Sequence, residues 1–157
     1  MKHFSTKTYG HDRGLSCVFR QPNATHSHCS LLHGYSLSFS FMFGCETLDE
    51  KNWVVDFGGL KVLKNWLEEN FDHTLVVDKH DPHMQDFIEL ERKGLAKVVV
   101  LGGVGCEKFA EEAYKFANRV VNELTDGRCF CISCEVSEHE ANSAIYKGYG
   151  YWKSISP

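Results

Sequence analysis

The chain has 157 residues, of which 43% are hydrophobic and 24% charged, and its net charge is −4. These values are typical of one globular domain and argue against intrinsic disorder. The negative net charge argues against nucleic acid or an anionic membrane as a binding partner. No apolar run approaches the ~20 residues of a membrane span, and the N-terminus lacks the apolar core of a secretory signal. We therefore expect a single domain over residues 1–157, located in the cytoplasm.

The first elements in chain order follow from the spacing of apolar residues. Residues 36–43 alternate between apolar and polar side chains, which predicts a half-buried strand of an antiparallel sheet. After a polar connection, residues 53–56 are expected to return as a second strand, so that 36–56 would form a hairpin. Asp56 is a good N-cap, and helical spacing of apolar residues predicts a helix that begins near Leu60 and ends near Phe71.

The second half of the chain predicts further helices and strands. We expect a short β segment at 74–77, a short helix at 84–93, a buried strand at 98–101, a glycine turn at 102–105, a helix at 106–122 and a last strand at 128–137. The glycine turn lacks the Lys-Ser/Thr of a P-loop and is a weak phosphate signal. This order indicates an α+β fold, a four-stranded antiparallel sheet that carries two helices on one face. Because the strands are rich in Phe and Cys, we expect the other face to meet another subunit.

Seven cysteines, an odd number, predict reduced thiols and not a disulfide framework. Cys131 and Cys134 have the CxxC spacing of zinc and redox sites. They lie in an alternating run, so we expect a strand to point the two thiols to opposite faces, where they cannot chelate one ion. We interpret them as small strand residues.

Three histidines, His26, His28 and His33, lie within eight residues of one another. Three imidazoles can make a zinc site with one open position, and the alternative is a polar, solvated loop. Cys29 lies four residues before His33. Beside a metal ion or a protonated imidazole its pKa would fall, which would make it a usable base or nucleophile, and the alternative is a buried hydrophobe.

Two carboxylates complete the candidate site. Asp72 precedes His73, and an adjacent carboxylate can fix the tautomer of an imidazole in a proton relay. Glu138 closes the expected last strand, where a carboxylate can accept two N–H bonds from a guanidine-like edge such as that of a 2-amino-4-oxo pteridine ring. From this motif alone, a solvated acidic loop is the simpler interpretation.

Taken together, four motifs resemble the 6-pyruvoyl-tetrahydropterin synthase and 6-carboxytetrahydropterin synthase family. They are Cys29-x3-His33-Gly-Tyr35, Trp53-Val-Val-Asp56-Phe-Gly-Gly-Leu60-Lys61, Asp72-His73 and Glu138-x7-Tyr146. The resemblance covers residues 15–77 and 103–147, and it leaves 78–100 as an insertion.

The resemblance implies a tunnelling fold (T-fold), a homohexamer built as two trimers, and sites at subunit interfaces. It implies 7,8-dihydroneopterin triphosphate as the substrate and zinc, held by three histidines, as a Lewis acid. Cys29 would take and return protons, Asp72 and His73 would form a relay on the opposite side, and Glu138 would anchor the pterin ring. A lyase of the 6-carboxy type would serve 7-deazaguanine (queuosine) synthesis in a bacterium.

Two positions depart from the family pattern. Tyr35 replaces one zinc histidine, and the best alignment places Phe19 at another, although aligning His11 instead would recover one ligand. His26 and His28 could join His33 in a rebuilt zinc site. Two other hypotheses stay open: a T-fold enzyme with altered pterin or purine chemistry, and a non-catalytic pterin-binding protein that has lost zinc.

Overall fold

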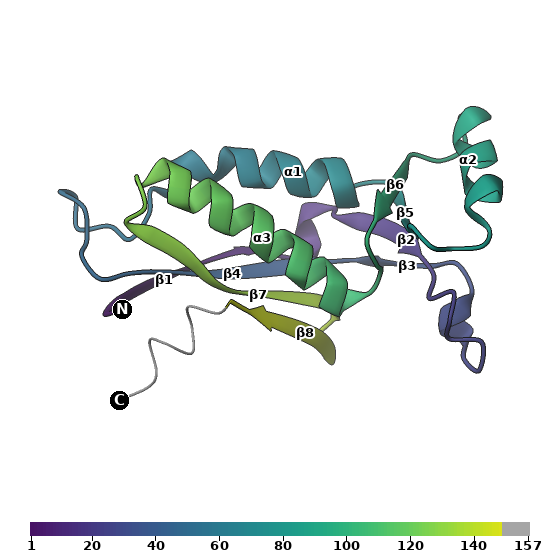
Figure 1. Ribbon diagram of the computed structural model, residues 1–157, viewed down its shortest axis with the longest axis horizontal. Helices are drawn as coiled ribbons and strands as arrows, with labels where there is room; N and C mark the ends of the chain where they lie inside the picture. The colour runs from purple at the N-terminus through teal and green to yellow at the C-terminus, as the bar shows by residue number, and fades with distance from the viewer. Residues whose placement is uncertain (149–157) are drawn as a thin grey trace.

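The computed structural model describes residues 1–148, which form two four-stranded sheets and three α-helices (Figure 1). The strands are β1 (His3–Tyr9), β2 (Ser16–Phe19), β3 (His33–Ser36), β4 (Ser38–Cys45), β5 (Thr74–Asp78), β6 (Val98–Leu101), β7 (Cys129–His139) and β8 (Asn142–Lys147). The helices are α1 (Lys61–Phe71), α2 (Met84–Arg92) and α3 (Cys106–Leu124), with short 3-10 helices η1 (His11–Arg13), η2 (His28–Ser30) and η3 (Phe57–Leu60). In the described residues, no helix is long and apolar enough to span a membrane.

The first sheet is antiparallel, in the order β1-β4-β7-β8, and α1 and α3 lie together on one of its faces (Figure 1). This confirms the expected α+β class and the four-stranded antiparallel sheet that carries two helices. The alternation in β4 has the predicted effect, because Phe39, Phe41 and Phe43 are fully buried against the helices. Leu63 and Leu67 of α1 and Phe109 of α3 complete this core from the other side.

The second sheet, in the order β3-β2-β5-β6, was not expected. β2 pairs with β3 antiparallel and with β5 parallel, and β5 pairs with β6 parallel. The single strand predicted from residue 36 is therefore divided between two sheets, with Leu37 between β3 and β4. The strand at 98–101 is confirmed, but its predicted burial is wrong, because β6 is an edge strand and Val100 is 50% exposed.

The predicted hairpin over 36–56 is wrong, since residues 53–56 form an irregular loop. Side chains satisfy the backbone of this loop in place of a partner strand. Asp49 accepts hydrogen bonds from the N–H groups of Lys51 and Trp53, and Arg128 donates to the carbonyls of Trp53 and Val54. The hydrogen-bonding edges of β4 are already taken by β1 and β7.

The sequence did not predict the two strands at the edges of the first sheet, β1 and β8. β1 is mostly polar, and β8 follows the strand that was expected to be the last one. Both strands are defined by their partners, β4 and β7, more than by their own hydrophobic pattern. The expected end of β7 is also two residues short, because β7 continues to His139.

The expected orientation of the CxxC pair is wrong as well. The register of β7 shifts at Ile132, so that Cys131 lies opposite Phe43 and Cys134 opposite Phe41. This β-bulge adds one residue between the two thiols and turns both to the buried face. Each thiol donates to a nearby backbone carbonyl, Cys131 to Ser133 and Cys134 to Glu135. The interpretation as small strand residues agrees with these contacts, but the expected placement on opposite faces does not, because both thiols are buried.

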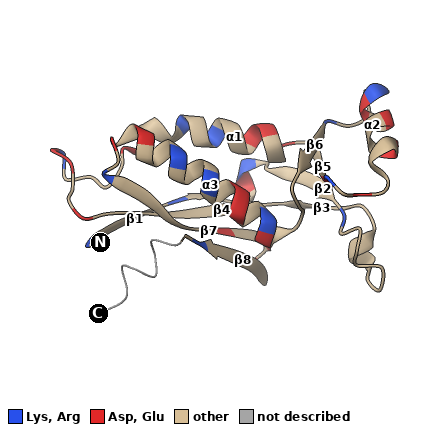
Figure 2. Cartoon of the chain, in the orientation of Figure 1, with Lys and Arg blue, Asp and Glu red and all other residues tan. Residues whose placement is uncertain are grey.

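Charged residues of both signs lie along the three helices, while most residues of the sheets are uncharged (Figure 2). Several helix charges form pairs one turn apart, such as Lys64 with Glu68 and Lys115 with Glu111. The sheets therefore supply the apolar layer of the molecule, and the helices supply much of its charged surface.

Candidate active site

An aromatic cluster forms where the second sheet meets α3. The register of β2 and β3 sets Phe19 opposite His33 and Cys17 opposite Tyr35, so these side chains share one face of the sheet. The ring centroids are 5.1 Å apart for Phe19 and His33, 6.2 Å for Phe19 and Tyr35, and 5.5 Å for His33 and Tyr35. His33 and Tyr35 thus point to the same side, as the sequence predicts.

The glycine between them is required by the close approach of β2. A Cβ atom on Gly34 would lie 2.9 Å from the carbonyl oxygen of Cys17 and 3.2 Å from Cγ2 of Val18. The first distance is shorter than real Cβ contacts allow. Gly34 therefore lets β3 lie against β2 closely enough to bring His33 and Tyr35 onto Phe19.

Cys29 lies in η2, within the loop that connects β2 to β3. Ser27 caps this short helix by accepting a hydrogen bond from the N–H of Cys29, and the Cys29 carbonyl accepts one from the N–H of Gln21 at 2.7 Å. The Cys29 thiol is exposed, whereas the other six cysteines are buried. The alternative that Cys29 is a buried hydrophobe is therefore wrong.

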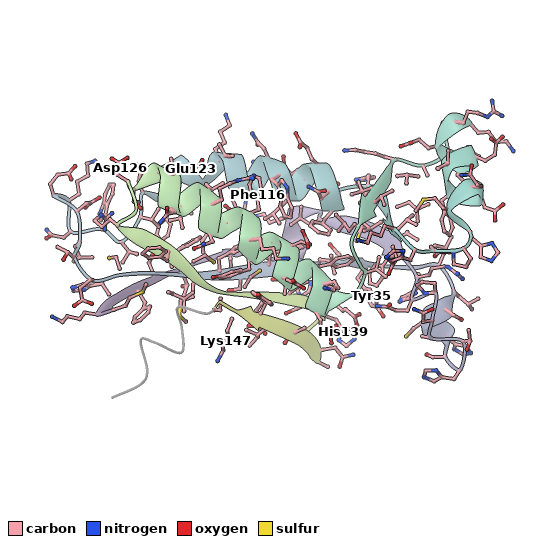
Figure 3. All side chains as sticks on the ribbon, in the orientation of Figure 1. Tyr35, Phe116, Glu123, Asp126, His139 and Lys147 are labelled. Carbon is pink, nitrogen blue, oxygen red and sulfur yellow. The ribbon has the colours of Figure 1, made fainter. Side chains whose placement is uncertain are left out.

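Glu138 approaches the same cluster from the first sheet. It lies at a second register shift in β7, between Ser137 and His139, and bulges of this kind re-aim side chains next to active sites. The ring of His139 lies 6.2 Å from that of Tyr35, and the two residues are seen side by side beyond the N-terminal end of α3 (Figure 3). Glu138 is half-buried and belongs to β7, so it does not lie in a solvated loop.

Electrostatic effects on Tyr35 show which ionisable groups surround it. Its pKa is raised above the ordinary value, first by desolvation and then by electrostatic interaction with Glu138, Cys29 and Cys106. Burial, with Glu138 and Glu107 nearby, raises the pKa of Cys106 to about 12. The Cys106 thiol is therefore protonated at neutral pH and does not compete with Cys29 as a base.

Asp72 and His73 lie in a different place. Asp72 ends α1, and its carboxylate contacts Nδ1 of His73 at 2.5 Å. The N–H of His73 donates to the carbonyl of Ser16, which is three residues from Phe19 along β2, roughly 10 Å at the rise of a strand. In residues 1–148 no hydrogen bond, ion pair or ring contact joins this pair to the aromatic cluster. Both side chains face solvent.

The three histidines expected to bind zinc are not brought together. His26 and His28 are exposed, and Nδ1 of His33 is within 2.7 Å of the Leu31 carbonyl. Within the described part of the chain, no three His, Cys, Asp or Glu side chains are grouped so that they could hold a metal ion. His11, the ligand of the alternative alignment, contacts the Ser36 carbonyl.

The donor set therefore does not fit zinc within one subunit. The family positions that would hold three imidazoles carry Phe19, His33 and Tyr35, packed ring against ring. A phenyl ring has no lone pair to offer, and zinc in proteins is bound by Cys, His, Asp and Glu.

Sequence reasoning missed three contributors to this site: Cys106, Phe109 and His139. Phe109 packs edge-on against Phe19 at 5.1 Å, and its helical spacing pointed only to a core position. His139 directly follows Glu138, but only the bulge in β7 turns it toward Tyr35. A groove of about 700 Å³ lies elsewhere, along the edge strand β1 beside Trp53 and Phe57. Because none of the candidate residues lines that groove, we place the site at the aromatic cluster.

Comparison with known proteins identifies the fold and family of this arrangement. The sequence model of the 6-pyruvoyl tetrahydropterin synthase family matches residues 8–149. The chain belongs to this family.

Curated relatives carry a more specific name. The chain is 39% identical over 62 residues to 6-carboxy-5,6,7,8-tetrahydropterin synthase of Rickettsia bellii, covering 39% of this chain and 45% of that protein. It is 32% identical over 92 residues to the protein of the same name from Aquifex aeolicus, covering 58% of this chain and 54% of that one. The chain thus matches about half the length of these relatives.

Solved structures confirm the T-fold. An uncharacterized protein from Wolinella succinogenes superposes with a TM-score of 0.74 at 17% identity, covering 93% of this chain and 98% of that one. The 6-pyruvoyl tetrahydropterin synthase of Plasmodium falciparum superposes with a TM-score of 0.64 at 15% identity, with the same coverage. At these identities the likeness concerns the fold alone.

Proposed function

We propose that this protein is a lyase of the 6-carboxytetrahydropterin synthase type that acts on 7,8-dihydroneopterin triphosphate. The observation that carries the proposal is the meeting of the two sheets at one end of α3, where the ring of Tyr35 lies 6.2 Å from that of His139, the residue after Glu138 (Figure 3). Both Glu138 and Cys29 act on the pKa of Tyr35 there. The curated relatives of the chain bear the name of this activity. A role in 7-deazaguanine synthesis and a cytoplasmic location belong to the same proposal.

Each residue of the cluster has a role that suits its position. Glu138 is half-buried at a bulge, where its two carboxylate oxygens can accept the paired N–H donors of the pterin edge and fix the ring. Cys29 is the exposed thiol, so it can take a proton from the substrate side chain and return it. The pKa of Tyr35 is raised by both of these residues, and its hydroxyl can donate a hydrogen bond to a substrate oxygen.

We further propose that Asp72 and His73 act on the site of a neighbouring subunit. Within one chain the pair faces solvent and stands apart from the aromatic cluster. Among the described residues β1 is an edge strand of the first sheet, so its outer backbone groups can pair with another subunit of a trimer or hexamer. A carboxylate-oriented imidazole from a second subunit would supply the proton relay opposite Cys29.

Zinc dependence remains a prediction from the family resemblance. A three-histidine site would require the loop that carries His26 and His28 to move, because these residues and His33 form no group in the described chain that could hold a metal ion. The metal content of the protein, compared among wild type and the His26→Ala, His28→Ala and His33→Ala variants, tests this directly. About one zinc per subunit, lost in these variants, is the result expected for a rebuilt site.

An enzyme with altered pterin chemistry is a second candidate, and Phe19 and Tyr35 favour it. They put a phenyl ring and a phenol where the family pattern has imidazoles, so the polar groups around the substrate side chain differ. A turnover screen over pterin triphosphates, pyruvoyl pterins and purine analogues separates this candidate from the first. Conversion of 7,8-dihydroneopterin triphosphate with release of acetaldehyde and triphosphate supports the main proposal, and turnover of other compounds alone supports the second.

A non-catalytic pterin-binding protein is the third candidate. It would bind pterin through Glu138 without reaction, and its binding would be indifferent to Cys29→Ala. Tight pterin binding without any product, in the presence of added zinc, would establish this candidate and contradict both enzyme proposals.

A further inference from the structure

The loop that carries Cys29 is tied to the segment 78–97 by one guanidinium group, that of Arg20. Nε of Arg20 donates to one carboxylate oxygen of Asp81 at 2.8 Å, and Nη2 donates to the other at 3.2 Å. The remaining terminal nitrogen, Nη1, donates to the carbonyl of Ser30 at 2.9 Å. Ser30 follows Cys29 directly, so Arg20 joins the Cys29 loop to Asp81 through a single planar group.

Strand order explains why these residues meet. Arg20 follows β2, and Asp81 follows β5, which runs parallel to β2 as its neighbour in the second sheet. Chain segments that leave the same ends of adjacent parallel strands lie at one edge of the sheet. Asp81 is fixed there, since it accepts a hydrogen bond from the N–H of His83, and its own N–H donates to Asp78.

The pair is buried enough to matter energetically. The Asp81 side chain is 1% exposed and that of Arg20 is 19% exposed. Removing one partner of such a pair leaves a buried charge without compensation, which is strongly unfavourable. Lysine cannot replace Arg20, because an ammonium group does not present the planar fork that reaches both carboxylate oxygens and the Ser30 carbonyl.

The rest of the Cys29 loop is closed by contacts that do not involve Asp81. The N–H of Gln21 donates to the Cys29 carbonyl, and the Gln21 side chain donates to the carbonyl of Val104 in the turn before α3. Together with Arg20, these contacts hold both ends of the loop in place. The Arg20–Asp81 pair is the contact that extends this support to the segment 78–97.

We propose that Arg20 and Asp81 are positioning residues for Cys29, and that the segment 78–97 supports the active site by holding Asp81. This role rests on the proposed function for its kinetic consequence, but its structural consequence can be measured without substrate. The pair fixes Ser30, and Ser30 fixes the preceding residue, Cys29, relative to the aromatic cluster.

Peptide-resolved hydrogen exchange of the intact protein tests the structural part. Several amides of the loop are protected by hydrogen bonds, namely those of Gln21, Ala24, Ser27, Ser30 and Leu31. In Asp81→Asn we expect these amides to exchange at least ~10-fold faster, while the amides of α3 stay protected over the exchange times at which the loop exchanges. Equal acceleration throughout the protein, or no acceleration in the loop, overturns the proposal.

Glu89→Gln is the matched control. Glu89 receives a similar two-point hydrogen bond from Arg92, at 2.8 and 2.6 Å, in the same segment, but that pair is exposed and does not contact the loop. We expect wild-type exchange in residues 21–31 of this variant. Arg20→Lys should exchange like Asp81→Asn, and wild-type exchange in Arg20→Lys would overturn the geometric role assigned to the guanidinium.

Steady-state kinetics on 7,8-dihydroneopterin triphosphate test the functional part. In Asp81→Asn we expect kcat to fall by up to ~100-fold, with KM changed less than ~3-fold, because a misplaced thiol slows the proton transfer more than binding. Faster exchange in the loop with no turnover in wild type would refute the proposed function and leave the positioning role intact. Turnover in wild type with unchanged exchange and kcat in Asp81→Asn would refute the positioning role alone.

Discussion

At the scale of single residues, Cys29 differs from the other cysteines in its surroundings. Burial raises the pKa of Cys17 to about 12 and that of Cys129 to about 11, so these thiols stay protonated at neutral pH. Cys29 lies in a loop and faces solvent. We predict that iodoacetamide modifies one thiol per subunit in the native protein and that mass spectrometry locates it at Cys29. Modification of buried cysteines at the same rate would contradict the burial described.

Replacement of Cys29 should affect turnover and leave the fold intact. Because the side chain is exposed, Cys29→Ala should change the midpoint of thermal unfolding by less than ~2 °C. Loss of a positioned proton-transfer group should lower kcat by ~10²- to 10⁴-fold. Steady-state kinetics and calorimetry on the same sample check the two effects. A fully active variant would remove Cys29 from the proposed mechanism.

Gly34 shows how a single backbone position controls the cluster. Gly34→Ala should force β3 away from β2 and lower the free energy of unfolding by ~1–3 kcal/mol. Gly102→Ala is the control, since a Cβ at Gly102 would meet nothing within 4 Å, and it should stay within ~0.5 kcal/mol of wild type. Denaturant unfolding measures both. Equal stability of the two variants would show that β2 and β3 can accommodate a Cβ atom at residue 34.

At the scale of elements, the Arg20–Asp81 contact between the two loops should give stability a recognisable pH dependence. Burial alone would raise the pKa of Asp81, but hydrogen bonds from Arg20 and from the N–H of His83 outweigh it and lower the pKa. The stabilisation is thus fully present above the unfolded pKa of ~3.9 and is lost as the pH falls through the lower, folded value.

Comparing the free energy of unfolding of wild type and Asp81→Asn at several pH values tests this pH dependence. Near pH 7 the variant should be less stable by about 3 kcal/mol, the cost typical of breaking a buried pair. The difference should shrink below pH ~4, where wild type loses the same contribution. Denaturant unfolding across this range is the measurement. A stability difference between the two proteins that stays constant down to the most acidic pH would contradict a contribution from the ionised Asp81 carboxylate.

The elements that sequence could predict are those whose pattern is set by the core. The alternation of Phe39, Phe41 and Phe43 and the helical spacing from Leu60 to Phe71 were confirmed because each pattern matches one buried face. β1 and β8 were missed because their partners define them, and the loop at 53–56 was misassigned because Asp49 and Arg128 satisfy its backbone. The bulge at Ile132 depends on the strand opposite and has no local signal.

At the scale of the whole molecule, the candidate site was only partly predictable. The motif spacing and the family resemblance brought Cys29, His33 and Glu138 to attention before any geometry was known. Spacing could not show that Asp72 and His73 lie apart from them within one chain, or that Arg20 reaches Asp81. Contacts of that kind depend on the order of strands in the second sheet, which has no signature in the sequence.

Subunit mixing tests whether the relay comes from a neighbour. Cys29→Ala and His73→Ala subunits should each be inactive alone. After co-refolding, mixed oligomers should regain part of the activity, because some sites then combine an intact Cys29 with an intact His73 from another subunit. Size-exclusion chromatography with light scattering establishes the oligomeric state of each sample. Absence of any regained activity in a confirmed mixed oligomer would place both residues in the same subunit's site.

The most direct test of the account is acetaldehyde release from 7,8-dihydroneopterin triphosphate by the purified protein, measured with added zinc and after chelation, beside Cys29→Ala. We predict release by wild type that accompanies formation of a 6-carboxypterin product and is absent from Cys29→Ala. Activity that disappears on chelation and returns with zinc would add the predicted metal dependence. No acetaldehyde from wild type under any of these conditions would contradict the assignment as a lyase of the 6-carboxytetrahydropterin synthase type.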